Sequence, residues 1–452
     1  MKQNRDFYTT RQYLGDYNLN YNVHQMPLYN TIASNHQHPG NYRKRLYLHI
    51  DMDCFYAQIE QQCYNLYGIP VIIGGWRKEN GIARGIVATS SYEARRLGIK
   101  TGMSAYEAVQ ICPYIVPLQV HYEKYKAISR DINTILNSFV DEIEAYSMDE
   151  YFFDVSFLLK RDRGEILDFG TRLKNEIYRK TKLTSSVGIA YSKTYSKLAS
   201  NLRKPNGLTV ILNTKEAAQL LYPLSLNEVW GIGRIRFKKL KNEGVNTISD
   251  AIKRGPEIFQ KIFGFYFGKM LFEAVCGKDC AKVMNRTDHV PREITYMHTF
   301  SNWTIEMVRL RGEITKAVQQ LCYRMRGSDR KAEKYGGYIR IQDITWKGIS
   351  FIFATKGLTN LNNYVLQACL EVAEPLLTQF IQEGHKIRGI GLHTIEMNTN
   401  NQLELFFRED EKLARMYFAM YKINNRFGLD TIIQASMNYA VEGKTHFLER
   451  NT

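Results

Sequence analysis

Two pairs of carboxylates stand out in the sequence because each lies beside a strand-like run of apolar residues. Asp51 and Asp53 close the segment 46–53, in which apolar and polar residues alternate, so both carboxylates share one face of the expected strand. Asp149 and Glu150 lie at the expected turn of a hairpin over residues 142–156. Anions two residues apart on one face repel each other, so we expect a positive charge to be held near them.

These carboxylates indicate a divalent metal site. Carboxylate oxygens are hard ligands suited to Mg²⁺, and Asp51, Asp149 and Glu150 would supply three such side chains. Phosphoryl transfer is the chemistry that such a site usually serves. One metal ion activates the attacking hydroxyl, and a second, ~3.5–4 Å away, neutralises the leaving phosphate. Neither pair is strong evidence alone, since adjacent acidic residues are common on protein surfaces.

Residues that could hold a triphosphate accompany the carboxylates. Tyr92 and Arg95 begin a helix directly after a predicted strand, so the hydroxyls of Thr89 and Tyr92 and the guanidinium of Arg95 can face a phosphate. Lys204 lies on a turn within the segment RKPNG. Each residue alone could be a solvated surface residue, but together with the carboxylates they favour phosphoryl transfer.

The composition fits a large protein that binds nucleic acid. The chain has 452 residues, enough for three or four domains. Its formal net charge of +16 favours a polyanionic partner, most simply nucleic acid, over a merely solvated basic surface. The seven cysteines are scattered and odd in number, which indicates reduced thiols in a cytosolic protein. No apolar run is long enough to span a membrane, so we expect a soluble, intracellular protein.

Periodicity divides the chain into regions of different character. Residues 1–45 are polar and lack sustained periodicity, whereas 121–140 has the pattern of an amphipathic helix. Residues 213–285 read as short helices. Residues 293–398 read as strand, helix, hairpin, helix and strand, which predicts two helices on one face of a four-stranded sheet.

Five segments, in this order and at this spacing, together resemble the Y-family (translesion) DNA polymerases, in particular those of the bacterial polymerase IV type. They are DMDCFYAQIE, ATSSYEARRLGI, YSMDEYFFDVS, GIAYSKTYSKLASNLRKPNG and VWGIGR. The resemblance covers about residues 46–398. Agreement of five ordered motifs by chance is very improbable.

The resemblance implies an α+β multidomain right-hand polymerase fold. It would have a palm of mixed β-sheet and helices, small fingers, a helical thumb with a helix–hairpin–helix, and a C-terminal α/β little finger. We expect a flexible N-terminal arm over 1–45, the palm over 46–56 and 120–212, the fingers over 57–119, the thumb over 213–285, a linker over 286–292, the little finger over 293–398, and a tail over 399–452.

The resemblance also assigns roles in the palm and fingers. Asp51, Asp149 and Glu150, with the main-chain carbonyl of Met52, would bind two Mg²⁺ ions, which Mn²⁺ can replace; Asp53 would only support them. The triphosphate would be held by Thr89, Tyr92, Arg95 and Lys204. Phe55 and Tyr56 would line the sugar, and Tyr56 would be the steric gate, whose ring leaves no room for a 2′-hydroxyl. A plain core aromatic is the alternative for Tyr56.

Further segments would hold DNA and a sliding clamp. Gly231 and Gly233 resemble a helix–hairpin–helix that binds backbone phosphate, although Trp230 replaces the usual proline. Arg330, Lys331 and Lys334 are the basic residues of the little finger that we expect to contact DNA. The segment 401–407 resembles the bacterial clamp-binding peptide, with contacts from Gln402, Leu403, Leu405 and Phe406. A buried strand is the alternative for this segment.

The expected function is template-directed DNA synthesis of low fidelity, with translesion bypass in DNA repair. Primer–template DNA, deoxynucleoside triphosphates and the sliding clamp would be the partners of a monomer in the cytoplasm, associated with the nucleoid. Three alternatives stay open: a catalytic subunit of the polymerase V kind that needs partner proteins, a haloacid dehalogenase-type phosphohydrolase, and an inactive scaffold. The phosphohydrolase expects Thr or Val at the position of Phe55, and the scaffold does not need all three carboxylates, which are present.

Overall fold

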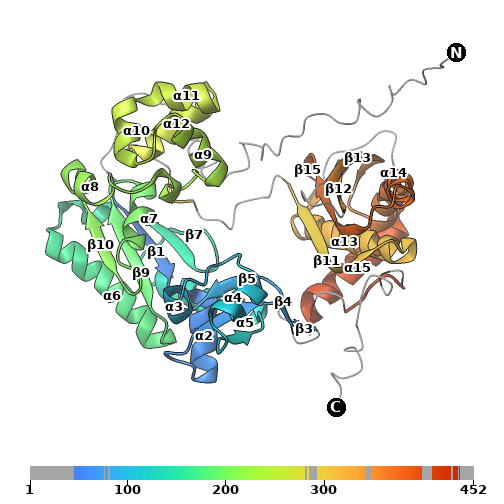
Figure 1. Ribbon diagram of the computed structural model, residues 1–452, viewed down its shortest axis with the longest axis horizontal. Coiled ribbons are helices and arrows are strands. Elements are labelled where there is room, and N and C mark those ends of the chain that lie inside the picture. The colour runs from blue at the N-terminus through green and yellow to red at the C-terminus, as the bar shows by residue number, and fades with distance from the viewer. Residues whose placement is uncertain are drawn as a thin grey trace. The chain divides into compact units, whose positions relative to one another are not determined.

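The computed structural model describes residues 45–75, 77–79, 82–279, 282–284, 293–341, 348–399, 410–428, 431–435 and 437. The chain divides into two compact units, one with the described residues up to 284 and the other with those from 293 onward (Figure 1). Within the described ranges, no helix is both long and apolar enough to cross a membrane.

A five-stranded sheet with the order β10-β9-β1-β8-β7 forms the centre of the first unit. The central strand β1 is antiparallel to both of its neighbours, and β10 is parallel to β9. The strands are β1 (Tyr47–Met52), β7 (Ile143–Ala145), β8 (Glu150–Asp154), β9 (Ser185–Ala190) and β10 (Leu208–Ile211). The predicted alternation of β1 and the predicted 142–156 hairpin are therefore both present.

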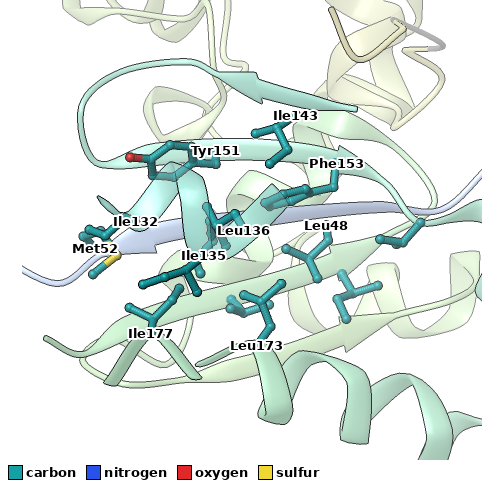
Figure 2. Close-up of a cluster of buried hydrophobic side chains, with 14 of the residues drawn as sticks. Leu48, Met52, Ile132, Ile135, Leu136, Ile143, Tyr151, Phe153, Leu173 and Ile177 are labelled. Carbon is teal, nitrogen blue, oxygen red and sulfur yellow. The ribbon is translucent and has the colours of Figure 1, made fainter. Parts of the chain in front are cut away.

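Helices cover both faces of this sheet. Figure 2 shows Leu48 and Met52 of β1 packed with apolar side chains of α5 (Tyr122–Asn137) and α6 (Arg163–Thr181). A short 3-10 helix, η2 (Ser156–Lys160), precedes α6. The other face lies under α7 (Lys193–Asn201), where the His49 imidazole is buried and its Nδ1 lies 2.8 Å from Ser200 Oγ. Both faces of β1 are thus buried, including the one that carries polar residues.

Close packing of α7 depends on a glycine. Gly188 of β9 lies opposite His49 of β1 and so faces the same helix. A Cβ at this position would be 2.0 Å from the carbonyl oxygen of Ser196 and 2.3 Å from the amide nitrogen of Ser200. Only glycine allows the helix to lie this close to the sheet.

A smaller sheet, with the order β5-β2-β6, is inserted after β1. It comprises β2 (Val71–Gly74), β5 (Val87–Ser90) and β6 (Val116–Leu118), with a separate pair β3 (Arg77–Glu79) and β4 (Ile82–Arg84). Its helices are α2 (Phe55–Tyr64), α3 (Tyr92–Arg96) and α4 (Ala105–Ile111). Helix α2 ends where Asn65 takes the left-handed conformation.

Short helices complete the first unit, as the pattern over 213–285 predicts. They are α8 (Thr214–Leu220), η3 (Leu226–Glu228), α9 (Arg234–Asn242), α10 (Ile248–Arg254), α11 (Pro256–Phe263) and α12 (Phe265–Val275). Their apolar side chains form one cluster that also includes Tyr195 and Leu198 of α7. Helix α7 therefore joins the sheet to the helical part of the unit.

The second unit has a sheet with the order β11-β14-β12-β13, and a short strand β15 also pairs with β12. The predicted sheet of four strands is therefore present, with a short fifth strand paired to the first residues of β12. The elements are β11 (Thr295–Thr304), α13 (Met307–Gly327), β12 (Arg330–Ile341), β13 (Gly348–Thr359), α14 (Asn362–Gln382), β14 (Ile387–Thr394), β15 (Met397–Thr399) and α15 (Glu411–Phe427). Apolar residues of α13 and α14 share one buried cluster with alternate residues of β12.

Helix α15, for which the sequence offers no physical account, packs on α13. The rings of Tyr421 and Tyr323 lie 5.0 Å apart, and the guanidinium of Arg326 lies 5.5 Å from the centre of the Tyr417 ring. Arg326 also donates to the carbonyl of Asn360 and to Asn362 Oδ1. Arg326 therefore has a structural role within the second unit.

Candidate active site

The predicted catalytic carboxylates meet where β1 ends and β8 begins. Asp51 lies directly opposite Glu150 in the antiparallel register of these strands. Asp149 precedes β8, and its carbonyl oxygen accepts a hydrogen bond from the amide of Met52 at 2.9 Å. Directly opposed residues of antiparallel strands have neighbouring side chains. The fold therefore places Asp51, Met52, Asp149 and Glu150 in one site, although they are about a hundred residues apart in sequence.

Each carboxylate of this site has a polar partner. Lys204 Nζ lies 2.6 Å from Asp51 Oδ2, and Lys197 Nζ contacts Glu150 Oε1. Ser147 Oγ donates to Asp149 Oδ1 and accepts the amide N–H of Glu150 at 3.1 Å. The positive charge that the two carboxylate pairs require is thus supplied in this structure by two lysines.

The electrostatics of the site still favour an additional cation. Burial and the neighbouring Glu150 raise the pKa of Asp51 to about 6, even though the Lys204 ammonium acts in the opposite direction. The pKa of Asp149 is also raised, first by burial and then by the charge of Asp51. Burial and a neighbouring negative charge both disfavour the ionised form of a carboxyl group, and a bound cation stabilises that form.

The donor set fits Mg²⁺, which prefers carboxylate and carbonyl oxygens. Among the described residues, no three Asp, Glu, His or Cys side chains already surround a point where an ion could lie. The lysine contacts account for this, because the carboxylates of Asp51 and Glu150 each point to an ammonium group. Asp51, Asp149, Glu150 and the carbonyl of Met52 are the groups that could hold the metal.

The predicted triphosphate residues of the inserted region lie at the start of α3. Tyr92 is its first residue, and its hydroxyl donates to Asp53 Oδ1 at 3.3 Å. Arg95 Nε donates to the carbonyl of Ser90 at 3.0 Å, and the guanidinium lies 4.9 Å from the centre of the Tyr92 ring. Thr89, the penultimate residue of β5, is partly exposed.

Asp53 connects these residues to the turn that carries Lys204. Its carboxylate is buried and also accepts from Thr184 Oγ1 at 2.9 Å, Ser186 Oγ at 2.8 Å and the amide of Asn206 at 2.7 Å. Asn206 follows Lys204 by two residues. A carboxylate with this many donors has a structural role, which is the support expected of Asp53.

The two aromatics at the start of α2 differ in exposure. Phe55 is buried, whereas Tyr56 is partly exposed and its ring stacks on that of Tyr125 with centres 4.3 Å apart and planes at 14°. The pKa of Tyr56 is raised, first by burial and then by the charge of Asp149. Tyr56 therefore lies within electrostatic reach of the carboxylate site.

The predicted phosphate-binding glycines lie just before α9. Gly231 has a φ of 92°, a conformation that favours glycine, and Gly233 is the N-cap of α9, with open space around its Cβ position. Trp230, which replaces the usual proline, stacks on Phe152 of β8 at 5.7 Å and donates from Nε1 to the hydroxyl of Tyr146 at 3.2 Å. Trp230 thus attaches the glycine turn to the β7–β8 hairpin, which carries Asp149 and Glu150.

The remaining predicted contacts lie in the second unit or outside the described residues. Arg330, Lys331 and Lys334 all belong to β12, where Lys334 is exposed and the other two are partly buried. Gln402, Leu403, Leu405 and Phe406 fall outside the residues that the structure describes.

Three residues near the site are absent from the sequence-based set. Lys197, Ser147 and Tyr125 contact Glu150, Asp149 and Tyr56, respectively. Lys193 and Lys197 are four residues apart and so share one face of α7, a spacing visible in the sequence. Nothing in the sequence shows that this face lies on a buried sheet, so the spacing alone assigns no role to the two lysines.

Comparisons with known proteins agree with this geometry. The impB/mucB/samB family model matches residues 50–201. DNA polymerase IV of Clostridioides difficile (strain 630) is 37% identical over 309 residues, which are 68% of this chain and 81% of that protein. DNA polymerase IV 1 of Bacillus subtilis (strain 168) is 29% identical over 412 residues, 90% of this chain and 96% of that protein.

A solved structure of a chimeric Y-family DNA polymerase has the same fold. It aligns with a TM-score of 0.65 and 25% sequence identity, over 77% of this chain and 98% of that one. The right-hand polymerase fold predicted from the sequence is therefore confirmed. The chain belongs to the Y-family DNA polymerases, to which bacterial DNA polymerase IV also belongs, and is a DNA-directed DNA polymerase.

Proposed function

We propose that this polymerase extends a primer 3′-hydroxyl on a DNA template, using deoxynucleoside triphosphates and two Mg²⁺ ions at Asp51, Asp149 and Glu150. The main support is the opposition of Asp51 and Glu150 across β1 and β8, with Asp149 beside them. Family membership removes the phosphohydrolase alternative. It also supports translesion synthesis of low fidelity, because the curated relatives are DNA polymerase IV proteins.

In this mechanism the residues of the chain position the reactants. Bound Mg²⁺ would supply activation of the attacking hydroxyl and neutralisation of the leaving phosphate. Lys204 lies beside Asp51 and could pair with a phosphate oxygen of the incoming nucleotide. Tyr92 and Arg95, held by Asp53 and by the Ser90 carbonyl, present a hydroxyl and a guanidinium for the same triphosphate. Thr89 would add a second hydroxyl.

Sugar selection is assigned to Tyr56. Its ring is partly exposed, and Tyr56 lies in the first turn of α2, directly after the end of β1 that carries Asp51. A ring in van der Waals contact with the C2′ position rejects a ribonucleotide by a steric clash.

DNA contacts outside the site would be to backbone phosphate. Gly231, Gly233 and the basic helix α9 offer main-chain N–H groups and cations in the first unit. In the second unit, Arg330, Lys331 and Lys334 belong to β12, a strand of the sheet that packs against α13 and α14. Contacts of this kind weaken steeply as salt rises.

The first prediction concerns catalysis. Asp149→Asn removes one anionic ligand while preserving shape, so Mg²⁺-dependent primer extension should fall by roughly 10³-fold, which corresponds to about 4 kcal/mol of lost transition-state stabilisation. Extension of an undamaged primer–template by the purified variant measures this. Primer–template affinity, measured in parallel by fluorescence anisotropy, should change little. Extension by the variant at the wild-type rate would contradict the metal assignment, and an inactive wild type that binds DNA would indicate an obligate partner protein.

The second prediction concerns the gate. Tyr56→Ala removes the ring that clashes with a 2′-hydroxyl, so the ratio of kcat/KM for a deoxynucleotide to that for its ribonucleotide should fall by about 10²-fold or more, roughly 3 kcal/mol. Single-nucleotide insertion kinetics give both values. An unchanged ratio would refute the gate assignment and leave Tyr56 as a core aromatic.

We also propose that the segment 401–407 docks on a bacterial sliding clamp through Gln402, Leu403, Leu405 and Phe406. The residue pattern and its place in the chain support this proposal. The segment lies between two elements of the second unit, β15 and α15, and so follows the regions assigned to catalysis.

Replacement of Gln402, Leu405 and Phe406 by Ala should abolish stimulation of primer extension by the clamp, because the apolar anchors of the peptide are lost. Synthesis without the clamp should be unchanged, which serves as the control. The assignment is wrong if the clamp still stimulates the triple variant as it stimulates the wild type.

A further inference from the structure

Tyr125 of α5 contacts helix α2 at two positions that lie one turn apart. Its ring stacks on the ring of Tyr56, and its hydroxyl donates to Glu60 Oε1 at 2.7 Å. Tyr56 and Glu60 are four residues apart and therefore project from the same face of α2. Tyr125 thus contacts both the proposed gate, Tyr56, and Glu60 in the next turn of α2.

The Glu60 carboxylate is a fixed acceptor for this hydroxyl. It is fully buried and also receives Lys124 Nζ at 2.9 Å and His121 Nδ1 at 3.0 Å. Burial acts to raise the pKa of Glu60, but the hydrogen bonds from Tyr125, Lys124 and His121 outweigh it, so the pKa is lowered and the group is ionised. Hydrogen bonds to an ionised acceptor are about twice as strong as neutral ones.

The ring of Tyr125 is enclosed by the side chains around it. Its side chain is fully buried, and the ring of Phe55 lies on another side, with centres 6.4 Å apart. Burial and the hydrogen bond to Glu60 raise the pKa of Tyr125, so the phenol keeps its proton and continues to donate. Tyr56, by contrast, is partly exposed. The Tyr56 ring therefore stacks on a buried ring, that of Tyr125.

A steric gate works only if its ring stays in place. If the ring can tilt away by a fraction of an ångström, the clash with a 2′-hydroxyl disappears, because repulsion between atoms falls steeply with distance. We propose that Tyr125, oriented by Glu60, is a positioning residue for sugar selection that fixes the ring of Tyr56 in its excluding position. This inference rests on the proposed role of Tyr56 as the gate.

The test measures single-nucleotide insertion with a deoxynucleotide and with the matching ribonucleotide, for variants of the full chain. Tyr125→Leu removes the stacked ring, and the ratio of the two kcat/KM values should fall by about 10-fold, mainly because ribonucleotide insertion improves. Tyr125→Phe keeps the ring and loses only the bond to Glu60, so a smaller fall of about 3-fold is expected. A merely structural role would lower both efficiencies in parallel and leave their ratio unchanged, which would overturn the proposal.

Tyr122 provides a matched control. It belongs to the same helix and meets the Tyr56 ring edge-on at 6.2 Å and 88°, but it is 54% exposed and has no stacked contact with the gate. Tyr122→Leu should leave the ratio at the wild-type value. A fall as large as that of Tyr125→Leu would contradict a specific role for Tyr125.

Tyr56→Ala separates failure of this inference from failure of the gate assignment. If Tyr56→Ala leaves sugar selection intact, the gate itself is wrong. If Tyr56→Ala relaxes selection and Tyr125→Leu does not, the gate stands and the positioning role of Tyr125 is wrong. Should Tyr125→Leu fail to fold, Tyr125→Phe decides alone, since a ratio equal to wild type would then overturn the proposal.

Discussion

The antiparallel pairing of β1 with β8 is the constraint on which the site depends, because it places the carboxylate of Asp51 opposite that of Glu150. A shift of one residue in this register would turn one carboxylate to the opposite face. The register is fixed by burial on both sides, since apolar side chains of β1 enter the cluster with α5 and α6 while His49 lies under α7. The fold thus holds like charges together at a position where it also limits their solvation.

Helix α7 supplies the opposing charge through two lysines on one face. Lys193 pairs with Glu144 of β7 in a fully buried contact, and Lys197 pairs with Glu150 at the start of β8. Glu144 also accepts the amide of Met284 at 2.9 Å. A buried pair of this kind adds little net stability but is costly to break, so it fixes the hairpin that carries Asp149 and Glu150. Trp230 adds an aromatic contact to the same hairpin from the side of the helical region.

The sequence predicts the strands and the carboxylates because both leave local patterns. Alternation over 46–53 identifies β1, and the 142–156 hairpin identifies β8. Residues whose roles come from contacts distant in sequence leave no such pattern. The role of Lys197 becomes visible only where α7 lies on the sheet, and the sequence places Tyr125 only within an amphipathic helix. The departure from the glycine motif at Trp230 is explained by its stacking partner Phe152, which is distant in sequence.

Asp51 belongs to a cluster of carboxylates for which we propose a bound cation as the stabilising partner. Its pKa of about 6 in the folded protein exceeds its ordinary value, so the folded state holds this proton more tightly than the unfolded chain does. The contribution of Asp51 to stability is therefore present at low pH and is lost as the pH rises to about 6.

Thermal unfolding of the wild type and of Asp51→Asn, at pH 4.5 and at pH 7.5, with and without Mn²⁺, tests this claim directly. The two Tm values should differ less at pH 4.5 than at pH 7.5, where the variant without metal should have the higher Tm. Mn²⁺ should raise the Tm of the wild type by at least about twice as much as that of the variant. A variant that is less stable than the wild type at pH 7.5 without metal, or that gains as much from Mn²⁺, would contradict it.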